Sequence, residues 1–523
     1  MAAAVAASDY DVLPYRSTPY AHTQPAHLAA VGTLLGMAPP PAGRARILEL
    51  GSASGGNIIP LAARYPHARF IGIDLSLRQV EDGQRAIAQL GLQNIEIRHG
   101  NIGDLHIAGP QFDYIVCHGV FSWVPRTVQD AIFRICAENL AANGIVYISY
   151  NALPGWHLRR IVRDICHYHA GDQSTPEQRV TRARWMLEQV AKMSSESSTF
   201  GRIMRDEAKL TAPLPNSYIL GEFLAHDNDP CYFHEFAGRA AAKGLTFLCE
   251  ADLAASVPEN LGAEQAKLVR AIAGSNPIAL EQYMDFFTGR TFRRSLLVKS
   301  EHVSTVQRAL NPQRLRPLHL LSRLHRDAVA STQDNAIFRH ERRAITTNDP
   351  VVQRALEHLS RCYPDSCPVE QLIETVVPTG MPERANAQAR LLSALLRVTA
   401  AEHVSVSTLP LRTGRASATR PVVWSLARMQ ADKGQEWASS LHHRPVALHP
   451  ALRLLMRMLD GQHERIALRD RLVAAVAGGE TTIPGREVDA SASRPQLEAA
   501  ATQTIEQMLR YLEHHALLEP NTL

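Results

Sequence analysis

A short apolar run that breaks into a glycine-rich turn and then into a helix constrains this chain most. Residues 46–50 read Arg-Ile-Leu-Glu-Leu, and residues 57–65 carry apolar side chains at helical spacing. Between them, glycine stands at Gly51, Gly55 and Gly56. Glycine permits positive φ and removes Cβ, so a ligand can lie against the backbone, and the helix start favours a ligand carboxylate. The pattern predicts a nucleotide-binding strand-turn-helix unit.

Two carboxylates sharpen this prediction. Glu49 precedes the first glycine by two residues, and Asp74 ends a second apolar run, residues 68–74, 19 residues after Gly55. An acid at that place can accept hydrogen bonds from ribose hydroxyls. The glycine spacing, G-x-x-x-G-G, differs from the G-x-G-x-x-G of dinucleotide sites. A flavodoxin-like or NAD-binding crossover remains an alternative at this point.

The chain then alternates strands and helices, which predicts an α/β fold with a Rossmann-like sheet. Further strands are expected over residues 94–99, 112–119 and 145–150. Ligands bind beyond the carboxyl ends of the strands in such sheets. The loops after the fourth and fifth strands therefore bring aromatic and polar side chains to one edge: Trp123, Tyr150, Asn151, Trp156 and His157.

Length and composition exclude several classes of protein. At about 150 residues per domain, 523 residues indicate three or four domains. A net charge of +4 is too small to indicate nucleic acid or membrane binding. The seven scattered cysteines favour a reduced, cytoplasmic protein, and the pair Cys362 and Cys367 lacks the second pair of a zinc site, so no metal is expected. The start of the chain does not read as a signal peptide, and no run is long enough to span a membrane.

Several motifs resemble one enzyme family. E-L-G-S-A-S-G-G-N at 49–57 and F-I-G-I-D-L-S at 70–76 resemble motifs I and II of class I S-adenosylmethionine (SAM)-dependent methyltransferases. H-G-V-F-S-W-V-P at 118–125 and S-Y-N-A-L-P-G-W-H at 149–157 resemble the subgroup with a methyltransferase regulatory domain. This subgroup includes rickettsial-type protein lysine methyltransferases that act on outer-membrane proteins. The resemblance continues over residues 218–293 and weakens beyond about residue 300.

The resemblance implies that SAM is the cofactor and indicates which residues bind it. Ala53 stands where many family members have a third glycine, and Asn101 stands where they often have an acid, so its amide would accept from the adenine amino group. Asp104 is the other candidate for that role. The implied cofactor residues are Glu49, Gly51, Ser52, Ala53, Gly55, Asn57, Asp74, Leu75, Asn101, Ile102 and His118.

The residues expected to border the methyl acceptor lie at the same edge of the sheet. A lysine acceptor must be neutral, and desolvation among aromatic rings lowers its pKa. His118, His157 or water would take the proton. The candidate catalytic residues are His118, Trp123, Tyr150, Asn151, Trp156 and His157. The alternative for each is structural: a histidine that binds a backbone carbonyl, or a tryptophan that is simply packed.

The order of segments predicts four domains. Residues 1–170 form the SAM-binding domain, 171–300 a helical regulatory or dimerisation domain, 301–420 a middle domain, and 421–523 a helical C-terminal domain. In the middle domain, three helices and a strand at 403–407 resemble a winged-helix unit, without a basic recognition helix. The Pro- and Tyr-rich segment 8–25 is either a strap over the core or an aromatic lid. The basic residues between Arg290 and Lys299 are expected on a solvated face.

The sequence therefore predicts a SAM-dependent methyltransferase that acts on a nucleophilic nitrogen, foremost the lysine side chains of a protein. The implied partner is a protein, such as an outer-membrane or surface protein before export, and a homodimer is consistent with the regulatory domain. We expect no nucleic-acid partner and no membrane insertion. A small-molecule acceptor is one alternative, and a non-catalytic regulator that keeps a vestigial SAM fold is another.

Overall fold

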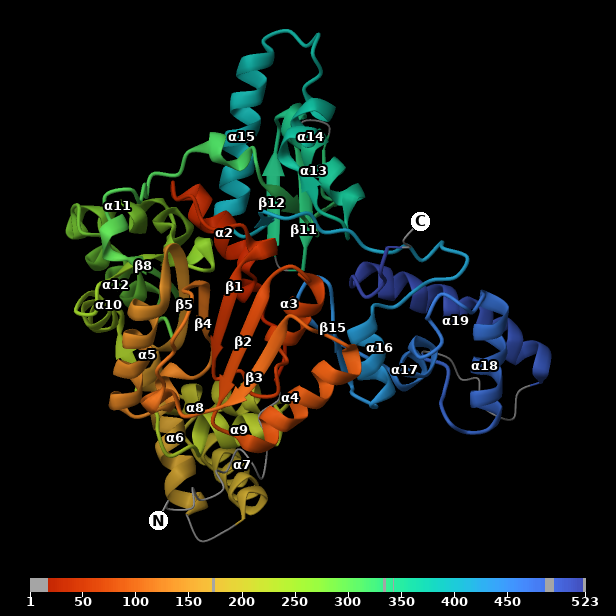
Figure 1. The fold of residues 1–523 in the computed structure, drawn as a ribbon, viewed down its shortest axis with the longest axis horizontal. Helices are drawn as coiled ribbons and strands as arrows, with labels where there is room; N and C mark the ends of the chain where they lie inside the picture. The colour runs from red at the N-terminus through yellow and green to blue at the C-terminus, as the bar shows by residue number, and fades with distance from the viewer. Residues whose placement is uncertain (1–16, 172–174, 333–334, 342, 485–492, 521–523) are drawn as a thin grey trace.

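The structure is a computed structural model that describes residues 17–171, 175–332, 335–341, 343–484 and 493–520. A central sheet with helices on both faces occupies the middle of the molecule (Figure 1). Three further parts extend from it: a helical bundle, a middle unit and a C-terminal arm. None of the helices in the described ranges combines the length and the hydropathy that a bilayer crossing requires.

The central sheet has the strand order β3-β2-β1-β4-β5-β8-β7, and β6 pairs with β5. The first five strands of that path are parallel, whereas β8 runs antiparallel to both neighbours. The strands are β1 (Arg46–Leu50), β2 (Arg69–Asp74), β3 (Ile95–His99), β4 (Phe112–Cys117), β5 (Leu140–Leu153), β6 (Cys231–Tyr232), β7 (Leu245–Glu250) and β8 (Phe292–Lys299). The sheet thus takes its last two strands from the range 171–300, which the sequence predicted as a mostly helical domain. Strand pairing across such a separation leaves no local signal.

Both faces of the sheet are covered, which explains the nearly continuous apolar runs of its strands. On one face, α2 and α3 pack against residues such as Ile47 and Tyr147. On the other, α5 and α10 pack against residues such as Leu48 and Tyr150. The covering helices are α2 (Pro25–Leu34), α3 (Ile58–Arg64), α4 (Leu77–Leu90), α5 (Arg126–Asn139), α10 (Phe233–Ala241), α11 (Ala263–Ala273) and α12 (Pro277–Thr288).

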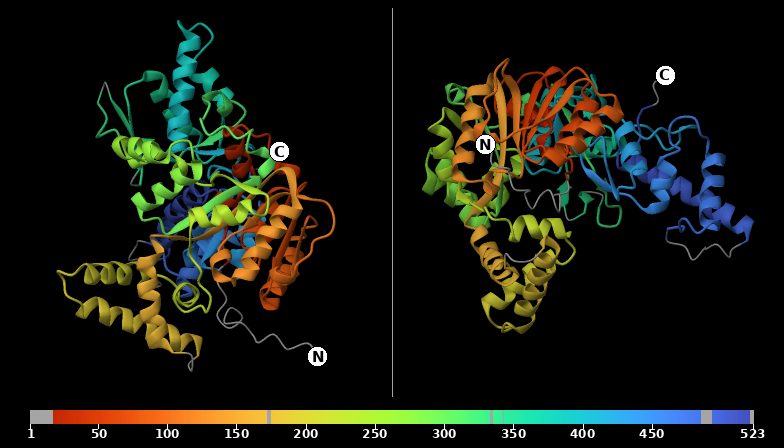
Figure 2. Two further views of the ribbon diagram at one scale, coloured as in Figure 1. Left: turned by 90° about the vertical axis from the view of Figure 1, so that its left-hand side faces the viewer. Right: turned by 60° about the horizontal axis from the view of Figure 1, so that its bottom comes forward.

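The four helices between β5 and β6 form a bundle with its own core (Figure 2). They are α6 (Trp156–Ala170), α7 (Pro176–Met193), α8 (Thr199–Thr211) and α9 (Asn216–Phe223). Apolar side chains also lie on the outside of this bundle: Tyr168 is 93% exposed, Met193 76% and Trp185 53%. The bundle therefore offers apolar surface beyond what its own core uses.

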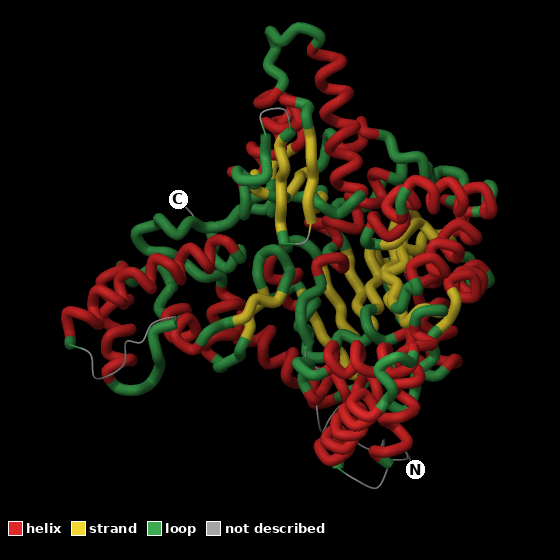
Figure 3. Tube along the Cα trace, turned by 180° about the vertical axis from the view of Figure 1, so that it is seen from behind, coloured by secondary structure: helices red, strands yellow, loops and turns green. Residues whose placement is uncertain are grey.

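The middle unit combines two small sheets with three helices (Figure 3). Its strands are β9 (His319–Leu321), β10 (His325–Arg326), β11 (Ala336–His340), β12 (Arg343–Thr347), β13 (Cys367–Pro368) and β14 (Ser405–Ser407), and its helices are α13 (Pro350–Cys362), α14 (Val369–Val376) and α15 (Arg384–Ala400). The three expected helices and the strand near residue 405 are thus present. The ligand atoms of His358 and Cys362 on α13 and of Cys367 on β13 lie within 4.8 Å of one another, one ligand fewer than a closed zinc site needs.

The C-terminal arm is mostly helical, with a short hairpin. It contains α16 (Ser425–Asp432), β15 (Trp437–Ser439), β16 (Pro445–Ala447), α17 (Pro450–Met456), α18 (Arg465–Ala477) and α19 (Arg494–His514). One apolar cluster runs from α2 through the middle unit to residues such as Leu512 and Leu518. Since this core is continuous, the loop 440–444 between β15 and β16 is held against the central sheet.

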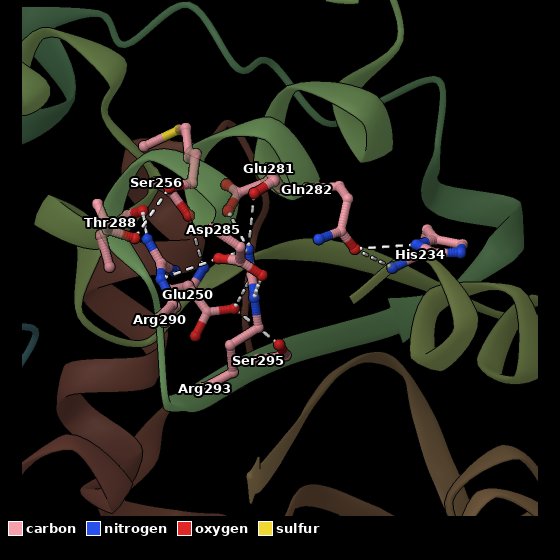
Figure 4. A network of polar contacts seen from close by, with 12 residues as sticks. His234, Glu250, Ser256, Glu281, Gln282, Asp285, Thr288, Arg290, Arg293 and Ser295 are labelled. Atoms are coloured by element: carbon pink, nitrogen blue, oxygen red, sulfur yellow. Dashed lines mark hydrogen bonds and ion pairs between the residues drawn. The ribbon is translucent and has the colours of Figure 1, made fainter. Parts of the chain in front are cut away.

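A buried ionic network fixes β8 to the helix before it (Figure 4). The Arg293 side chain is fully buried and donates to Asp285 Oδ2 at 2.8 Å, to Glu250 Oε1 at 2.7 Å and to Glu281 Oε2 at 3.1 Å. Arg290 Nε lies 3.0 Å from Asp285 Oδ1. The prediction of a solvated face was therefore wrong for Arg293. Sequence spacing could not show that three carboxylates from β7 and α12 converge on it.

Candidate functional site

The glycine-rich turn after β1 forms a tight loop at the carboxyl edge of the sheet. Gly51, Ala53 and Gly55 all have positive φ, of 76°, 48° and 80°. A Cβ at Gly51 would lie 2.2 Å from Val120 Cγ2, so only glycine fits there. Ala53 adopts this conformation despite its Cβ. The loop has the shape that the sequence predicted.

Most N–H groups of the loop are used inside the protein. Gly51 and Ser52 donate to Ile73 O, and Gly55 donates to Ser52 O at 2.9 Å. Gly56 donates to Ser17 Oγ at 2.9 Å. The ligand carboxylate expected at this helix start must therefore compete with the chain's own acceptors. The Ser52 hydroxyl is buried and faces Gly72 rather than open space, since a Cβ at Gly72 would lie 2.6 Å from it.

Glu49 lies beneath the loop, almost fully buried. Its Oε1 accepts a hydrogen bond of 2.7 Å from Asn57 Nδ2, and its Oε2 has no partner among the described residues. Burial, followed by the charge of Asp74, raises the pKa of the Glu49 carboxyl to about 8. A buried acceptor without a donor is costly, so this oxygen is suited to a cationic or hydrogen-bonding ligand group.

Asn57 joins three segments of the chain at one atom. Its Oδ1 accepts from Tyr20 N at 3.0 Å, from Thr23 Oγ1 at 2.9 Å and from His443 Nε2 at 2.8 Å. His443 comes from the C-terminal arm and is itself buried. The position of the Glu49 carboxylate thus depends on a histidine almost 400 residues away in the sequence. Sequence reasoning missed His443, and no local signal marks it.

Asp74, at the end of β2, is held by the loop that it faces. Its Oδ2 accepts from Ala53 N at 2.7 Å, and its Oδ1 accepts from Ser76 N at 2.9 Å. These contacts fix the carboxylate at the edge of the sheet, beside the exposed Leu75. Asp74 therefore lies fixed at the carboxyl end of β2, beside the glycine-rich turn.

In the loop after β3, Asn101 and Ile102 differ in their exposure to solvent. Asn101 is exposed, and its amide is used locally: Oδ1 accepts from Gly103 N and Nδ2 donates to Asp104 Oδ2, both at 2.9 Å. Ile102 is buried and packs with the sheet residues Leu50 and Ile73. An adenine could use the second lone pair of the Asn101 oxygen. Asp104, the other candidate, orients that amide.

The segment Ser17–Thr23 lies over this loop and contacts both the turn and His118. The Tyr20 ring centroid lies 3.7 Å from that of His118. A Cβ at Gly56 would lie 2.1 Å from Ser17 O, so the segment touches the turn directly. Residues 8–16, including Tyr10 and Tyr15, lie outside the described residues.

His118 directly follows β4 and packs against Tyr20. Its Nδ1 is 2.8 Å from the Tyr147 hydroxyl. Burial, and then the nearby charge of Arg294, lower the pKa of His118 to about 3. The imidazole is therefore neutral at physiological pH and a weak base.

The acceptor-side residues separate into two groups. The rings of Trp123 and Trp156 meet edge to face, with centroids 6.1 Å apart, and His157 is exposed, 3.3 Å from the Tyr232 hydroxyl. Trp156 is itself buried and donates through Nε1 to Asn228 Oδ1 at 2.8 Å. Trp123 and His157 are therefore the more accessible candidates.

Tyr150 and Asn151 lie on opposite faces of β5. Tyr150 is fully buried, stacks on Phe236 at 4.0 Å and is hydrogen-bonded to Ser295. Because it points into the core beneath α5 and α10, the structure does not bring it to the candidate acceptor edge. Asn151 N donates to Ser122 Oγ at 2.9 Å, and its buried Nδ2 has no partner among the described residues.

Comparison with known proteins places this geometry in a family. The chain is 30% identical to the uncharacterized protein RP789 of Rickettsia prowazekii over 512 residues, which cover 95% of this chain and 92% of that protein. It is 36% identical to RP028 of the same organism over 240 residues, 46% of this chain and 96% of that one. The solved structure of PKMT2 from Rickettsia typhi superposes with a TM-score of 0.85 at 26% identity and covers 97% of this chain and 100% of that one.

The chain belongs to the rickettsial PKMT-type class I methyltransferases. A methyltransferase domain model matches residues 47–144, and a predicted methyltransferase regulatory domain matches 215–299. The model described as the PKMT C-terminal winged helix domain matches 419–517. The winged-helix match thus lies in the C-terminal arm, not in the middle unit where the sequence indicated such a unit.

The protein is a SAM-dependent methyltransferase, and SAM is its cofactor. The solved complex of PKMT2 from Rickettsia typhi with AdoHcy superposes with a TM-score of 0.86. The residues of this chain fit such a ligand in two respects. Glu49 Oε2, which has no partner among the described residues, suits a cationic group, and Asp74 holds its carboxylate at the edge of the sheet beside the turn.

Proposed function

We propose that this methyltransferase transfers the methyl group of SAM to the side-chain nitrogen of lysine in a protein substrate. The observation that carries the proposal is the likeness to PKMT2 from Rickettsia typhi, which extends over 97% of the chain rather than over the cofactor-binding domain alone. A fold shared through the regulatory, middle and C-terminal parts supports a shared class of acceptor, because those parts lie outside the cofactor-binding unit.

For the cofactor, we propose a division of roles. Glu49 pairs with the ammonium of the methionine moiety, and Asp74 accepts from the ribose hydroxyls. Asn101 and Ile102 border the adenine, and Leu75 covers the ribose edge. Further contacts are assigned to the turn and its surroundings: Gly51, Ser52, Ala53, Gly55, Asn57 and His118.

When bound, SAM supplies an electrophilic methyl group for an in-line displacement, and the chain's residues orient the acceptor. We propose that the half-buried Trp123 and the exposed His157 border the entering lysine. An aromatic face attracts the methylammonium product, and partial desolvation favours the neutral amine. The buried Trp156 and Asn151 hold this edge in place, while Tyr150 contributes only by packing in the hydrophobic core.

The proton of the lysine must leave before the nitrogen attacks. His118 is a poor acceptor for it, because its pKa of about 3 disfavours the imidazolium. We assign His118 the role of a neutral positioning group beneath Tyr20. His157, being exposed, or water receives the proton.

The experiment is a transfer assay with radiolabelled SAM, offered separately to a lysine-rich denatured protein, to a panel of surface proteins and to small amines. Label in acid-precipitable protein, located on lysine by mass spectrometry, is expected. Transfer to small amines alone would instead favour a metabolite acceptor. Trp123→Ala and His157→Ala should lower kcat with unchanged SAM affinity, whereas Leu268→Ala, which removes an exposed apolar side chain on α11, is the matched control.

We further propose that the substrate is an outer-membrane or surface protein modified in the cytoplasm before export. We also propose that the α6–α9 bundle mediates a homodimer through its exposed Tyr168, Trp185 and Met193. Analytical ultracentrifugation of the full chain tests the second point. A monomer at all concentrations, or a dimer unaffected by Trp185→Glu, would contradict it.

A further inference from the structure

A cavity of about 430 Å³ lies between the methyltransferase domain and the middle unit. Its walls come from four distant segments: the start of α2, the strand ends near residues 251 and 294, the small sheet of the middle unit, and the loop 440–444 of the C-terminal arm. This volume lies within the range of small-ligand sites, about 300–1,000 Å³. The cofactor loop of residues 51–57 contributes none of its lining.

The lining is rich in positive charge. It includes five arginines, Arg64, Arg294, Arg323, Arg343 and Arg444, against three carboxylates, and it also includes six histidines. The carboxylate of Glu402 is already neutralised, since it lies 2.7 Å from both His22 Nε2 and Arg343 Nη2. Glu341 lies 3.5 Å from the His340 ring. Burial, and then the charge of Glu402, raise the pKa of the third acid, Asp252.

Four of the five guanidinium groups lack a compensating carboxylate. Arg64, Arg294, Arg323 and Arg444 form no ion pair with the described residues. Arg64 donates instead to Gln24 Oε1 at 2.9 Å and to Leu441 O at 3.0 Å. Several cations around one cavity repel each other, so the protein alone leaves this charge unbalanced.

Burial, and after it the charge of nearby arginines, shifts the pKa of several ionisable groups around the cavity. Burial first, and arginine charges second, keep the pKa of His319 and of His403 below its ordinary value. For His442, burial and the charges of Arg323, Arg64 and Arg444 bring the pKa to about 3. Desolvation and the charge of Arg323 also lower the pKa of Arg444.

Unsatisfied polar atoms gather on the same walls. Nδ1 of His319, His403 and His442, and Oγ1 of Thr399, are buried without a hydrogen-bond partner in the described part of the chain. The His442 and Thr399 side chains are more than nine-tenths buried. Buried polar groups are almost always paired in folded proteins, so their concentration around one cavity indicates a missing partner.

We propose that this cavity is a binding site for a multivalent anion, one that carries two or more carboxylate or phosphate groups. Guanidinium groups bind both of these chemistries through paired, charge-assisted hydrogen bonds. A lysine side chain fits poorly here, because its ammonium would face the uncompensated arginines. The cavity is therefore distinct from the acceptor edge at Trp123.

The site adjoins the cofactor loop through two consecutive residues. Arg444 lines the cavity, and the preceding His443 donates to Asn57, which in turn holds Glu49. An anion that draws Arg444 inward acts on the backbone of His443. Its presence should therefore be measurable as a change in SAM affinity as well as by direct binding.

Calorimetry of the full chain without cofactor tests the proposal with two probes at constant ionic strength: inorganic tripolyphosphate and a hexaglutamate peptide. Saturable binding of either probe is expected, and the preferred probe tells a free phosphate compound from an acidic polypeptide segment. Arg323→Gln and Arg444→Gln should each weaken binding about tenfold, the effect of one charge-assisted hydrogen bond. Arg510→Gln, at an exposed position on α19, is the matched control.

Two results would overturn the proposal: no saturable binding of either probe, or equal binding by the wild-type protein and both cavity variants. Should Arg323→Gln unfold, Arg444→Gln, in the loop between β15 and β16, provides the answer alone. Because the measurement needs neither SAM nor an acceptor, it remains decisive even if the proposed lysine substrate proves wrong.

Discussion

The cofactor loop and the interdomain cavity were built in opposite ways. The loop takes Glu49, Gly51, Gly55 and Asp74 from one short stretch of sequence, and each has a local reason for its residue type. The cavity takes its walls from segments spread between residues 21 and 444. The difference teaches that a site can be recognised from the sequence when its strand, turn and helix follow each other directly. A site assembled by domain packing carries no such order.

The two regions nevertheless meet at Asn57 and His443. The hydrogen bond between them joins the cofactor loop, which is built from one short stretch of sequence, to a loop 386 residues further along the chain. The predictions below separate effects confined to one region from effects that pass between them.

Removing Arg293 should have the largest effect, and it should fall on stability. Arg293→Ala leaves Glu250, Glu281 and Asp285 buried without their main cation, which costs about 3–5 kcal/mol of unfolding free energy. Urea denaturation measures the loss. Arg270→Ala, in an exposed pair with Glu259, should change stability by no more than about 1 kcal/mol. SAM affinity of the folded fraction should stay unchanged; a parallel loss would mean that the Arg293 network also supports the cofactor loop.

Removing Asp74 should have the next largest effect, confined to the cofactor loop. Asp74→Ala deletes the proposed acceptor for ribose and the partner of Ala53 N, so SAM affinity should fall by about 100-fold, equivalent to two charge-assisted hydrogen bonds. Fluorescence titration measures the affinity, with Glu96→Gln on β3 as control. Binding of anions in the cavity should not change, and an altered value there would contradict a local role.

SAM affinity should rise with pH because Glu49 must ionise to pair with an ammonium. The pKa of Glu49 is raised to about 8, so binding below that pH releases a proton, and affinity should increase about tenfold per pH unit up to pH 8. Calorimetry in buffers of different ionisation enthalpy measures the released proton. Glu49→Gln should bind weakly and without this slope; a wild-type profile that is flat from pH 6 to pH 8 would rule the pairing out.

The same carboxyl predicts how stability without cofactor depends on pH. Its folded-state pKa lies above the unfolded value, so the folded state binds the proton more tightly between about pH 4.5 and 8. The Glu49 contribution to stability is fully present below that window and is lost as the pH rises through it. Glu49→Gln should reduce the loss, as measured by thermal unfolding at successive pH values.

Removing His443 should give the smallest effect, and it tests the link between the regions directly. His443→Ala takes one donor from Asn57 while Tyr20 and Thr23 remain, so SAM affinity should fall by about fivefold, near the 1 kcal/mol of a neutral hydrogen bond. The matched control is His449→Ala, whose ring caps α17. Unchanged SAM affinity in His443→Ala would mean that His443 does not influence the cofactor loop through Asn57.

The sequence predicted much of the cofactor side because its physics is local. Gly51 and Gly55 adopt positive φ, and Asp74 ends its strand beside them, as the spacing indicated. The acceptor side was less predictable. Alternate residues of β5 point to opposite faces, and both faces are covered, so the apolar pattern did not reveal that Tyr150 faces the core. The use of β7 and β8 in the sheet was likewise invisible from spacing.

The sequence by itself determined the nucleotide-binding turn, its two carboxylates and the family, since these depend on residue types held in fixed register by a few covalent bonds. Only the tertiary structure decided the burial of Arg293, the reach of His443 to Asn57 and the basic cavity. Those features depend on which distant surfaces pack together, and packing is set by the sum of many weak, non-directional contacts that no short stretch of sequence records.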